Sequence, residues 1–231
     1  MSAARPARQR EELSTTLLNP MVEPLIAKLE RRDRLSREEK GVLEAAVTRV
    51  RDVRADEDIL REGDRPSEST LLLEGFAARY KVLSNGRRQI TALHVTGDFV
   101  DLHSFLLKPL DHGVVALTPC RLALVPHSVI EKITEQHPHL ARLLWLSTLI
   151  DGAIHREWLT AMGRRSATAH MAHLICELFV RLEAVGQVHD NTIHLPITQS
   201  ELGDTLGLST VHVNRVLQEL RKEGLIRLRS T

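Results

Sequence analysis

The stretch ITQSELGDTLGLSTVHVNRVLQELRKEGLI, residues 197–226, constrains the fold of this chain more tightly than any other segment. Thr198 and Glu201 have the spacing of a capping box, which predicts that a helix begins there and ends at the tight turn that Gly207 permits. Ser209 is placed to cap a second helix. Apolar residues at helical spacing predict the inward faces of both helices: Leu202, Leu206, Val213, Val216, Leu217 and Leu220. The segment therefore predicts two short helices joined at a glycine.

The outer face of the second helix carries side chains that suit the major groove of DNA. Arg215 can pair with both acceptors of guanine, Asn214 can pair bidentately with adenine, and Val211 can pack on a thymine methyl group. Polar side chains near the helix starts suit phosphates: Thr198, Gln199, Ser209, Thr210 and His212. Further cations lie nearby: Arg221, Lys222, Arg227 and Arg229. A helical hairpin with a merely solvated polar face fits the same local pattern. The strand-like TIHLPI before the hairpin and GLIRLRS after it, a candidate wing strand, favour DNA binding.

The segment from about Val50 to Val125 has a different pattern, with short alternating or β-branched runs separated by turn signals. The Asn85-Gly86 pair suits a two-residue hairpin turn. This spacing predicts a small antiparallel barrel or sandwich. Two helices are expected before it, over residues 21–32 and 36–50, and Ser36 with Glu39 would form a capping box at the second.

A proline-free stretch from about His139 to Met162 predicts a long helix. Apolar residues follow three- to four-residue steps along it: Leu140, Leu143, Leu144, Ile150, Ile154, Trp158 and Met162. With the additional apolar positions Leu146, Leu149 and Ala153, the helix is expected to pack both on the barrel and on a copy of itself. The expected dimer contacts are Leu143, Leu146, Ile150 and Ile154. A core helix within one monomer is the alternative. A further helix is expected to end at Gly186.

Composition excludes several classes of protein. Lys and Arg number 31 against 30 Asp and Glu, so nucleic-acid binding has to come from a local arrangement of cations. Cys120 and Cys176 lie far apart with no CxxC pair, which disfavours a disulfide framework or a cysteine-ligated iron-sulfur centre. The first residues lack a signal-peptide core and no run approaches ~20 apolar residues, so we expect a cytoplasmic protein with no membrane contact. No Ser-His-Asp arrangement, phosphate-binding glycine loop or paired metal motif stands out, so we expect no enzyme.

Three parts of the chain carry a family resemblance: a barrel with Gly-Asp turns, a long helix and the C-terminal TQSELGDTLGLSTVHVNRVLQELRKEGLI. Together they resemble the cyclic-AMP receptor protein and FNR (CRP/FNR) superfamily of bacterial transcription regulators, and the order of the parts matches over nearly the whole chain. The resemblance implies an α+β fold. Its expected parts are a flexible N-terminus (1–20), a cyclic-nucleotide-binding-like jelly-roll barrel with flanking helices (21–137), a dimerisation helix (138–163) and a winged helix-turn-helix (164–231). It also implies a homodimer that sets two recognition helices, about residues 209–222, into successive major grooves of a palindromic site, roughly 34 Å apart. RNA polymerase is the expected protein partner.

The recognition helix departs from the family pattern at one base-reading position. By the resemblance, Arg215 falls on the family's base-reading arginine, and Asn214 falls where FNR-like members carry a serine. Val211 falls where both well-known branches carry a glutamate, which accepts from the amino group of cytosine. Because valine cannot accept that hydrogen bond, the half-site is expected to differ at this base pair. The chain also stops at Thr231, where many relatives continue into a second wing strand.

The sensor barrel departs from the family members that bind cyclic nucleotides. They use a Gly-Glu pair for the ribose and an Arg-Ser pair for the cyclic phosphate, because a buried phosphate needs a guanidinium or several amides. Here Asp101 and Leu102 lie near the Gly-Glu positions, and no arginine occurs between Arg88 and Arg121. We therefore do not expect control by cyclic AMP. The candidate effector pocket is formed by Asp101, His103 and Lys108.

The sequence predicts no cofactor and no metal site, but binding of haem or another small effector remains an open alternative. His94, His103 and His112 flank the expected pocket and could serve as haem ligands, or could be ordinary hydrogen-bonded histidines. On one helix, His170 and His173 could share a face, but Cys176 lies about 240° further round, so the three cannot meet at one ion. Cys176 is expected to be a core residue. The alternative function is a haem- or small-molecule-binding sensor with a degenerate DNA-binding domain.

Overall fold

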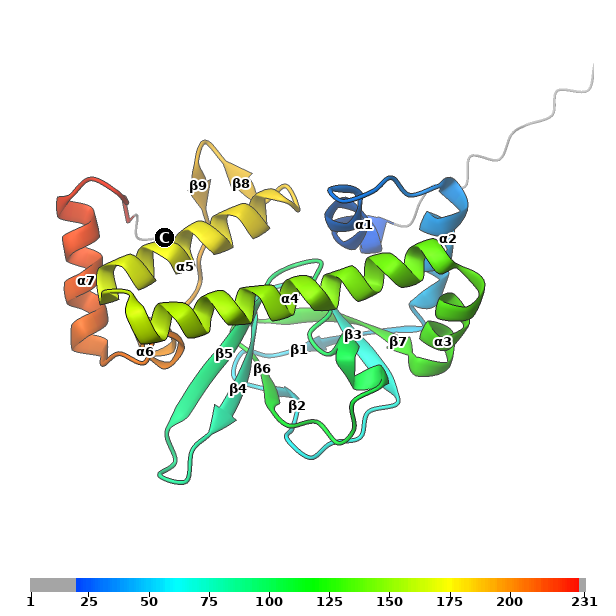
Figure 1. Ribbon diagram of the computed structural model, residues 1–231, viewed down its shortest axis with the longest axis horizontal. Helices are drawn as coiled ribbons and strands as arrows, with labels where there is room; N and C mark the ends of the chain where they lie inside the picture. Colours follow the sequence, from blue (N-terminus) through cyan, green and yellow to red (C-terminus); the bar gives the residue numbers. More distant parts are fainter. Residues whose placement is uncertain (1–19, 229–231) are drawn as a thin grey trace, which may run out of the picture.

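The computed structural model describes residues 20–228, and the helices and the strands form distinct layers (Figure 1). Arg229, which was counted among the nearby cations, and the N-terminal residues 1–19 lie outside the described part. The helical elements are, in chain order, η1 (Pro20–Val22), α1 (Glu23–Glu30), α2 (Arg37–Ala46), η2 (Leu102–Phe105), α3 (His127–Gln136), α4 (Pro138–Arg164), α5 (Ala167–Glu183), α6 (Gln199–Leu206) and α7 (Thr210–Lys222). The strands are β1 (Arg49–Val53), β2 (Asp58–Leu60), β3 (Glu68–Glu74), β4 (Ala77–Val82), β5 (Arg88–His94), β6 (Gly113–Ala116), β7 (Cys120–Pro126), β8 (Val188–His189) and β9 (Thr192–Ile193).

The expected antiparallel barrel is confirmed as two facing sheets. One sheet has the order β1-β7-β3 and the other has the order β2-β6-β4-β5. Leu72 and Leu122 of the first sheet pack with Ala77 and Val114 of the second in one buried cluster, because alternate residues of each strand point into the space between the sheets. The fold is α+β with a jelly-roll sensor domain, as the sequence predicted.

The β4–β5 hairpin corrects the expected two-residue turn. The Leu83 amide donates to the Arg87 carbonyl and the Gly86 amide donates to the Leu83 carbonyl, both at 2.8 Å, so the loop contains three residues. Gly86 has a φ of 79°, which places it in the left-handed region. The hairpin loop is therefore a type I turn followed by a glycine bulge, and Gly86 is the third loop residue, where a two-residue turn would make it the second.

Helices α1, α2 and α3 cover one end of the barrel. The capping box at Ser36 and Glu39 is confirmed, with the Ser36 amide donating to the Glu39 carboxylate at 2.8 Å. The helix ends at Ala46, earlier than the expected residue 50, because the chain joins the first sheet as β1 from Arg49. This helical layer buries Ile26 and Leu43 against residues of β3 and β7.

Helix α4 runs along the whole molecule, with the barrel on one side and α1 and α5 on the other (Figure 1). The expected apolar stripe is buried only at its two ends. Leu140, Leu143 and Leu144 lie in the core beneath α1 and α3, and Trp158 lies in the core shared with α5. Another apolar set on α4 is exposed, including Met162, which was expected in the buried stripe: Trp145, Leu149, Leu159 and Met162.

Helices α5, α6 and α7 pack together and also onto the outer face of the barrel. Leu174 and Leu206 share one buried cluster with Ile90 of β5. At the same contact Arg88 pairs with Asp204 at 2.9 Å. The strand expected over 192–197 is short, since β9 ends at Ile193, and it pairs only with β8. Residues 224–228 of the expected wing are not a strand, and the remaining residues of that segment lie outside the described part.

Candidate nucleic-acid interface and effector cavity

Helix α6 sets the position of α7 through two caps and a close backbone contact. Thr198 and Glu201 form the expected capping box, in which the Thr198 amide donates to the Glu201 carboxylate at 2.6 Å. Gly207 ends α6 in the left-handed conformation with a φ of 69°, and the Ser209 hydroxyl then accepts from the His212 amide at the start of α7. A Cβ at Gly203 would lie 2.6 Å from the Leu208 carbonyl oxygen. The turn between the helices is therefore tight enough to require glycine inside α6 as well.

The two faces of α7 differ sharply in exposure. The predicted inward residues are all buried: Val213, Val216, Leu217 and Leu220. On the other face Val211 is 82% exposed, and Asn214 and Arg215 are exposed beside it. A core that fixes one face of a helix leaves the opposite side chains in a defined orientation. The three predicted base-reading residues thus lie together on the outward face of α7.

The predicted phosphate-contacting residues lie around the same end of α7. Thr198, Gln199, Ser209 and Thr210 are exposed, whereas His212 is half-buried. The Asn214 amide nitrogen donates to the Gln199 side-chain oxygen at 3.4 Å, which connects the starts of the two helices. The predicted phosphate-contacting residues therefore lie at the starts of two helices that are joined through Gln199 and Asn214.

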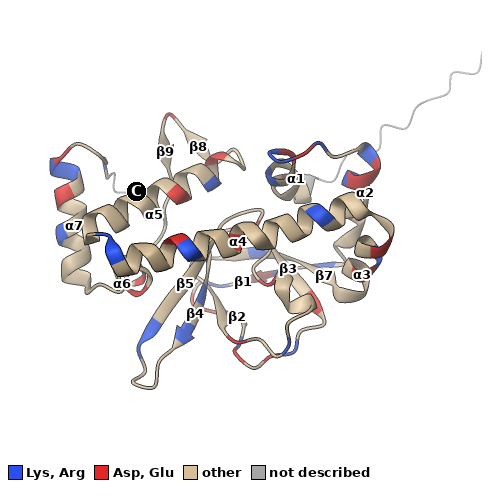
Figure 2. Ribbon diagram, in the orientation of Figure 1, with Lys and Arg blue, Asp and Glu red and all other residues tan. Residues whose placement is uncertain are grey.

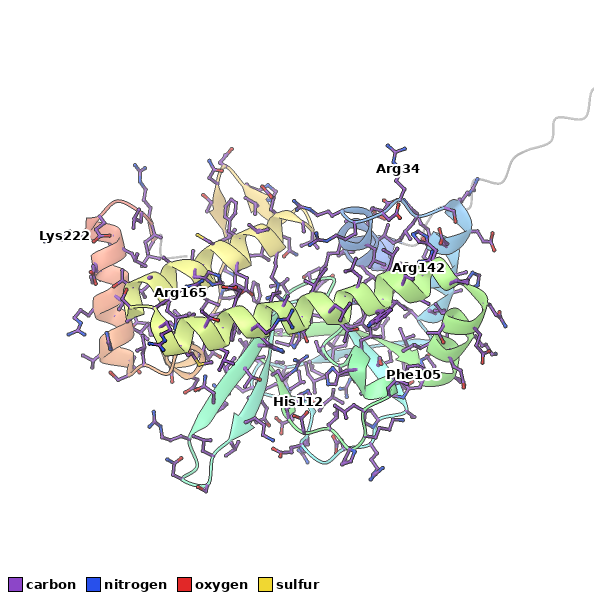
Figure 3. All side chains as sticks on the ribbon, viewed as in Figure 1. Arg34, Phe105, His112, Arg142, Arg165 and Lys222 are labelled. Atoms are coloured by element: carbon purple, nitrogen blue, oxygen red, sulfur yellow. The ribbon has the colours of Figure 1, made fainter. Side chains whose placement is uncertain are left out.

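Positive charge lies at the opposite end of α7 and at the junction of α4 and α5. Figure 2 shows basic residues at both places, and Figure 3 labels Lys222 at the end of α7 and Arg165 at the junction. Acidic residues lie among them, since Glu219 accepts from Thr168 and Arg165 pairs with Glu157 at 2.9 Å. The charge near α7 is mixed, in keeping with the formal net charge of +1.

The three residues of the predicted effector pocket do not come together. Asp101 is fully buried, and its carboxylate accepts from the Thr70 amide at 2.6 Å and from the Ser104 hydroxyl at 3.1 Å. Burial raises the pKa of Asp101 to about 7. Lys108 is exposed in the loop after η2. Only His103 lines a cavity.

Asp101, Ser104 and His127 form a cluster that sequence inspection missed. The Ser104 hydroxyl lies 3.1 Å from the Asp101 carboxylate and 3.3 Å from the His127 Nε2 atom, and Ser69 also contacts that nitrogen at 3.2 Å. In a hydrolytic triad the imidazole lies between the carboxylate and an accessible serine. Here the serine lies between the other two groups and is fully buried. The cluster therefore does not have the geometry of a triad, and its hydrogen bonds join β3, η2 and the start of α3.

A cavity of about 400 Å³ lies between the barrel, α1, α4 and α5. Its charged and imidazole-bearing lining comes from sequence-distant residues: Lys28, Arg31, Arg32, Arg79, His94, Asp98, His103, Asp151 and Arg181. Arg79 donates to Asp151 at 3.1 Å, and Arg181 donates to Asp98 at 2.7 Å. The absence of arginine between residues 88 and 121 therefore does not leave the cavity without guanidinium groups.

The structure also tests the histidine and cysteine expectations. His94 and His112 are buried, and burial lowers the pKa of both below the usual histidine value. The His103 and His112 ring centroids are 5.1 Å apart, and within residues 20–228 no three His, Cys, Asp or Glu side chains are grouped so as to hold a metal ion. Cys176 is exposed, so its expected place in the core was wrong, because it lies on the solvent side of α5.

Two protein-family models match this architecture. The cyclic nucleotide-binding domain matches residues 50–137, and the Crp-like helix-turn-helix domain matches residues 169–231. The chain belongs to the CRP/FNR family. This CRP/FNR protein is 27% identical over 199 residues to the transcriptional activator protein FnrL of Cereibacter sphaeroides, covering 84% of this chain and 79% of FnrL.

Further CRP/FNR relatives agree in sequence and in fold. The nitrogen fixation regulation protein FixK of Bradyrhizobium diazoefficiens is 29% identical over 175 residues, covering 74% of this chain and 70% of FixK. The structure of FixK2 from Bradyrhizobium japonicum superposes with a TM-score of 0.70 at 26% identity, covering 79% of this chain and 89% of that protein. The chain is thus a DNA-binding transcription regulator of the CRP/FNR type. Residues 20–228 contain no helix with the length and apolar character needed to cross a membrane.

Proposed function

We propose that this regulator binds a palindromic DNA site as a homodimer, with α7 of each protomer in the major groove. The outward face of α7, with Val211, Asn214 and Arg215 held over a buried apolar stripe, is the observation that carries the proposal. These three side chains read bases. The phosphate contacts come from the residues around the helix starts: Thr198, Gln199, Ser209, Thr210 and His212.

The pairing surface of the homodimer is the solvent face of α4. Trp145, Leu149, Gly152 and Leu159 lie on this face at the alternating four- and three-residue steps of a coiled-coil seam, with Arg156 completing the spacing. Large exposed apolar side chains in such a row favour burial against a second copy.

The dimer contacts expected from the sequence lie at different depths along α4. Leu143 is buried in the core of its own protomer. Leu146, Ile150 and Ile154 are half-buried, line the cavity and flank the pairing seam. The dimer interface therefore centres on Trp145 and Leu149, with these three residues at its edge.

Regulation by this protein does not use cyclic AMP. Near the ribose position of the cyclic-nucleotide-binding relatives, both carboxylate oxygens of Asp101 are already engaged by Thr70 and Ser104. No arginine occurs between Arg88 and Arg121, so the Arg-Ser pair that those relatives use for the cyclic phosphate has no counterpart in this interval. The two residue pairs by which those relatives hold a cyclic nucleotide therefore have no counterpart at these positions.

RNA polymerase is the partner through which the bound dimer acts. FnrL is named a transcriptional activator, which favours recruitment of polymerase over exclusion. The protein works where both DNA and polymerase are found, the bacterial cytoplasm.

A DNA-binding titration tests the proposal. Arg215→Ala should weaken binding to the cognate palindrome by roughly 1–3 kcal/mol, or about ten- to a hundredfold, and relax the preference at one base pair. Arg54→Ala, which removes an exposed arginine from the barrel turn between β1 and β2, is the matched control and should bind as the wild type does. Equal binding by Arg215→Ala would refute the docking of α7, and a requirement for added cyclic AMP would refute the proposal on regulation.

A further inference from the structure

The cavity beside α4 opens to solvent between α1 and α5. Arg31 and Arg32 are exposed at its lining just beyond the end of α1, and Val180 is exposed on the α5 side. Arg31 spans the opening, since its guanidinium lies 3.7 Å from the carboxylate of Glu183 on α5. A volume of about 400 Å³ is enough to bury a few side chains of a peptide. A segment of polypeptide can therefore enter the cavity from the solvent side of α1.

Three buried nitrogen atoms on the barrel side of this cavity have no hydrogen-bond partner within the described chain. They are the Nε atom of Arg79 and the Nε2 atoms of His94 and His103. The other guanidinium nitrogens of Arg79 are engaged, one by Asp151 at 3.1 Å and one by the Val100 carbonyl at 3.3 Å. Because a buried donor without an acceptor costs free energy, these nitrogens favour an occupant that brings acceptor atoms.

Positive charge exceeds negative charge along the lining. Five cations face two carboxylates: Lys28, Arg31, Arg32, Arg79 and Arg181 against Asp98 and Asp151. Both carboxylates are already paired with lining cations. Arg32 pairs with no carboxylate of the described chain. The lining therefore favours an occupant that brings carboxylates of its own.

Much of the remaining lining is apolar. It comes from α1, the barrel, α4 and α5, and its residues are Leu25, Leu29, Phe99, Leu102, Leu143, Leu146, Ile150, Ile154 and Val180. A complementary occupant therefore carries apolar side chains close to its carboxylates.

The sequence just before the described residues combines these two features in one short stretch. Residues 11–18 read EELSTTLL, so two glutamates are followed by Leu13, Leu17 and Leu18. Two residues further on the described chain begins with η1, which leads directly into α1. The stretch is thus tied to the helix that forms one side of the cavity.

The length of this stretch is sufficient to return to the mouth of the cavity. The start of α1 lies against the barrel beside the cavity, since a Cβ at Gly97 would lie 2.9 Å from the Pro24 carbonyl oxygen. The 8 residues of α1 rise only about 12 Å toward Arg32. An extended chain from Glu12 to Pro20 reaches up to roughly 28 Å. The segment can therefore run back along α1 over its full length.

We propose that residues 11–18 of the chain itself occupy this cavity, with Glu12 directed inward to Arg79 and Glu11 at Arg32 on the mouth. The two carboxylates take these separate partners because successive side chains of an extended segment point to opposite sides. Leu17 and Leu18 pack on the apolar lining beside α1. Docking of this segment does not depend on DNA binding and goes beyond the function proposed above.

Calorimetric titration with the peptide EELSTTLL, its ends blocked, tests the proposal on the full-length protein. Leu17→Asp with Leu18→Asp should free the cavity, because charged side chains are costly in an apolar lining. This freed protein should bind the peptide saturably. The wild type should bind it about tenfold or more weaker, because its own tethered segment competes at a high effective concentration. The peptide QQLSTTLL should bind the freed protein about tenfold or more weaker, since it lacks both carboxylates.

Two arginines near the end of α1 give a matched pair of variants in the freed protein. Arg32→Gln should lower the affinity for EELSTTLL by about two- to fivefold, the effect of losing an exposed ion pair. Arg34→Gln is the control, because Arg34 is exposed, does not line the cavity and points away from it into solvent (Figure 3). This variant should leave the affinity unchanged.

Several outcomes would overturn the proposal. No saturable binding of EELSTTLL to the freed protein would mean that the cavity does not accept the segment. Equal affinity in the wild type and the freed protein would mean that the segment is not the occupant. Equal affinity of the two peptides, or an affinity unchanged by Arg32→Gln, would contradict the role of the carboxylates. None of these results would affect DNA binding by α7, which is measured separately.

Limited digestion with trypsin supplies a second readout that needs no peptide. Arg10 directly precedes Glu11, so a docked segment hinders cleavage after Arg10. The wild type should be cut there about tenfold or more slowly than the freed protein, because proteolysis follows the population of the open form. Arg87, in the exposed β4–β5 hairpin, is the matched site and should be cut at the same rate in both proteins. Equal cleavage after Arg10 in the two proteins would overturn the proposal.

Discussion

The DNA-reading end of the molecule and the cavity beside α4 are built in opposite ways. The caps, the turn and the exposed residues of the α7 face all lie within residues 198–220, and α5 supplies the apolar surface on which the buried stripe of α7 packs. The lining of the cavity extends in sequence from Leu25 to Ala184 and comes together only when the barrel, α1, α4 and α5 are packed. The local sequence therefore determines the DNA-reading face of α7, which we call the reader, whereas the chain topology determines which residues line the cavity.

The same contrast appears in the charges. Arg215 is exposed and free to meet a base, whereas Arg79 is buried and paired with Asp151, and Arg181 is half-buried and paired with Asp98. A change in the reader should alter DNA binding with little effect on folding. A change in the cavity should alter both the packing and the docking of residues 11–18.

Gly203→Ala should give the largest effect, because the new methyl group would lie 2.6 Å from the Leu208 backbone oxygen. The turn would have to open, at a cost of about 1–3 kcal/mol, and binding to the palindrome should be lost. Thermal unfolding and a DNA titration measure the two effects. Gly41→Ala, where nothing lies within 4 Å of the added atom, is the control and should be neutral or stabilising by up to about 1 kcal/mol. Equal behaviour of the two variants would contradict the local origin of the reader.

Leu149→Arg should shift the protein from dimer toward monomer, because a charge would be placed in the pairing seam of α4. We expect the dimer dissociation constant to rise at least about tenfold, measured by analytical ultracentrifugation. Leu106→Arg changes an equally apolar and more exposed residue on the barrel loop and should leave the constant unchanged. A dimer unaffected by Leu149→Arg would place the protomer interface elsewhere.

Val211→Glu should change the base preference of the reader while leaving its fold intact, since residue 211 is exposed. The carboxylate can accept from the amino group of cytosine, so cytosine should be favoured at one position of each half-site by about 1–3 kcal/mol. Competition between palindromes that differ at that base pair measures the shift. An unaltered preference would mean that residue 211 does not reach the bases.

Asp101→Asn should change the pH dependence of stability without affecting the reader. Because burial raises the folded pKa of Asp101 from 3.8 to about 7, the contribution of this group to stability is full below pH 3.8 and is lost as pH rises to about 7. The variant should therefore gain stability relative to wild type across that window, at up to about 1 kcal/mol per pH unit, in melts at a series of pH values. Asp111→Asn should change in the opposite direction, because the His112 hydrogen bond lowers the pKa of Asp111.

The elements that the sequence predicted well are those governed by short-range rules. The caps at Ser36, Thr198 and Ser209 and the buried stripe of α7 all follow from the spacing of a few neighbouring residues. The turn at Asn85 and Gly86 was predicted one residue too short, because the same dipeptide fits both a two-residue turn and the glycine bulge that forms.

The cavity could not be predicted because its chemistry comes from pairs far apart in the chain. Arg79 lies in a strand, and no local pattern marks it, because its contacts with Asp151 and Val100 depend on how α4 crosses the barrel. The sequence places Asp101 in a pocket, but its side chain is buried and accepts a hydrogen bond from the Thr70 amide of β3. Periodicity also cannot tell which face of α5 meets a neighbour, so Cys176 was assigned to the core although it is exposed.

Selection of DNA from a random pool, with the wild-type protein and Arg215→Ala in parallel, tests the central claim most directly. The wild-type dimer should enrich a two-fold palindrome whose half-sites are about one helical turn apart, and Arg215→Ala should lose the preference at one position of each half-site. Enrichment of the same motif by both proteins, or of no palindrome by the wild type, would contradict the assignment of α7 as the reader.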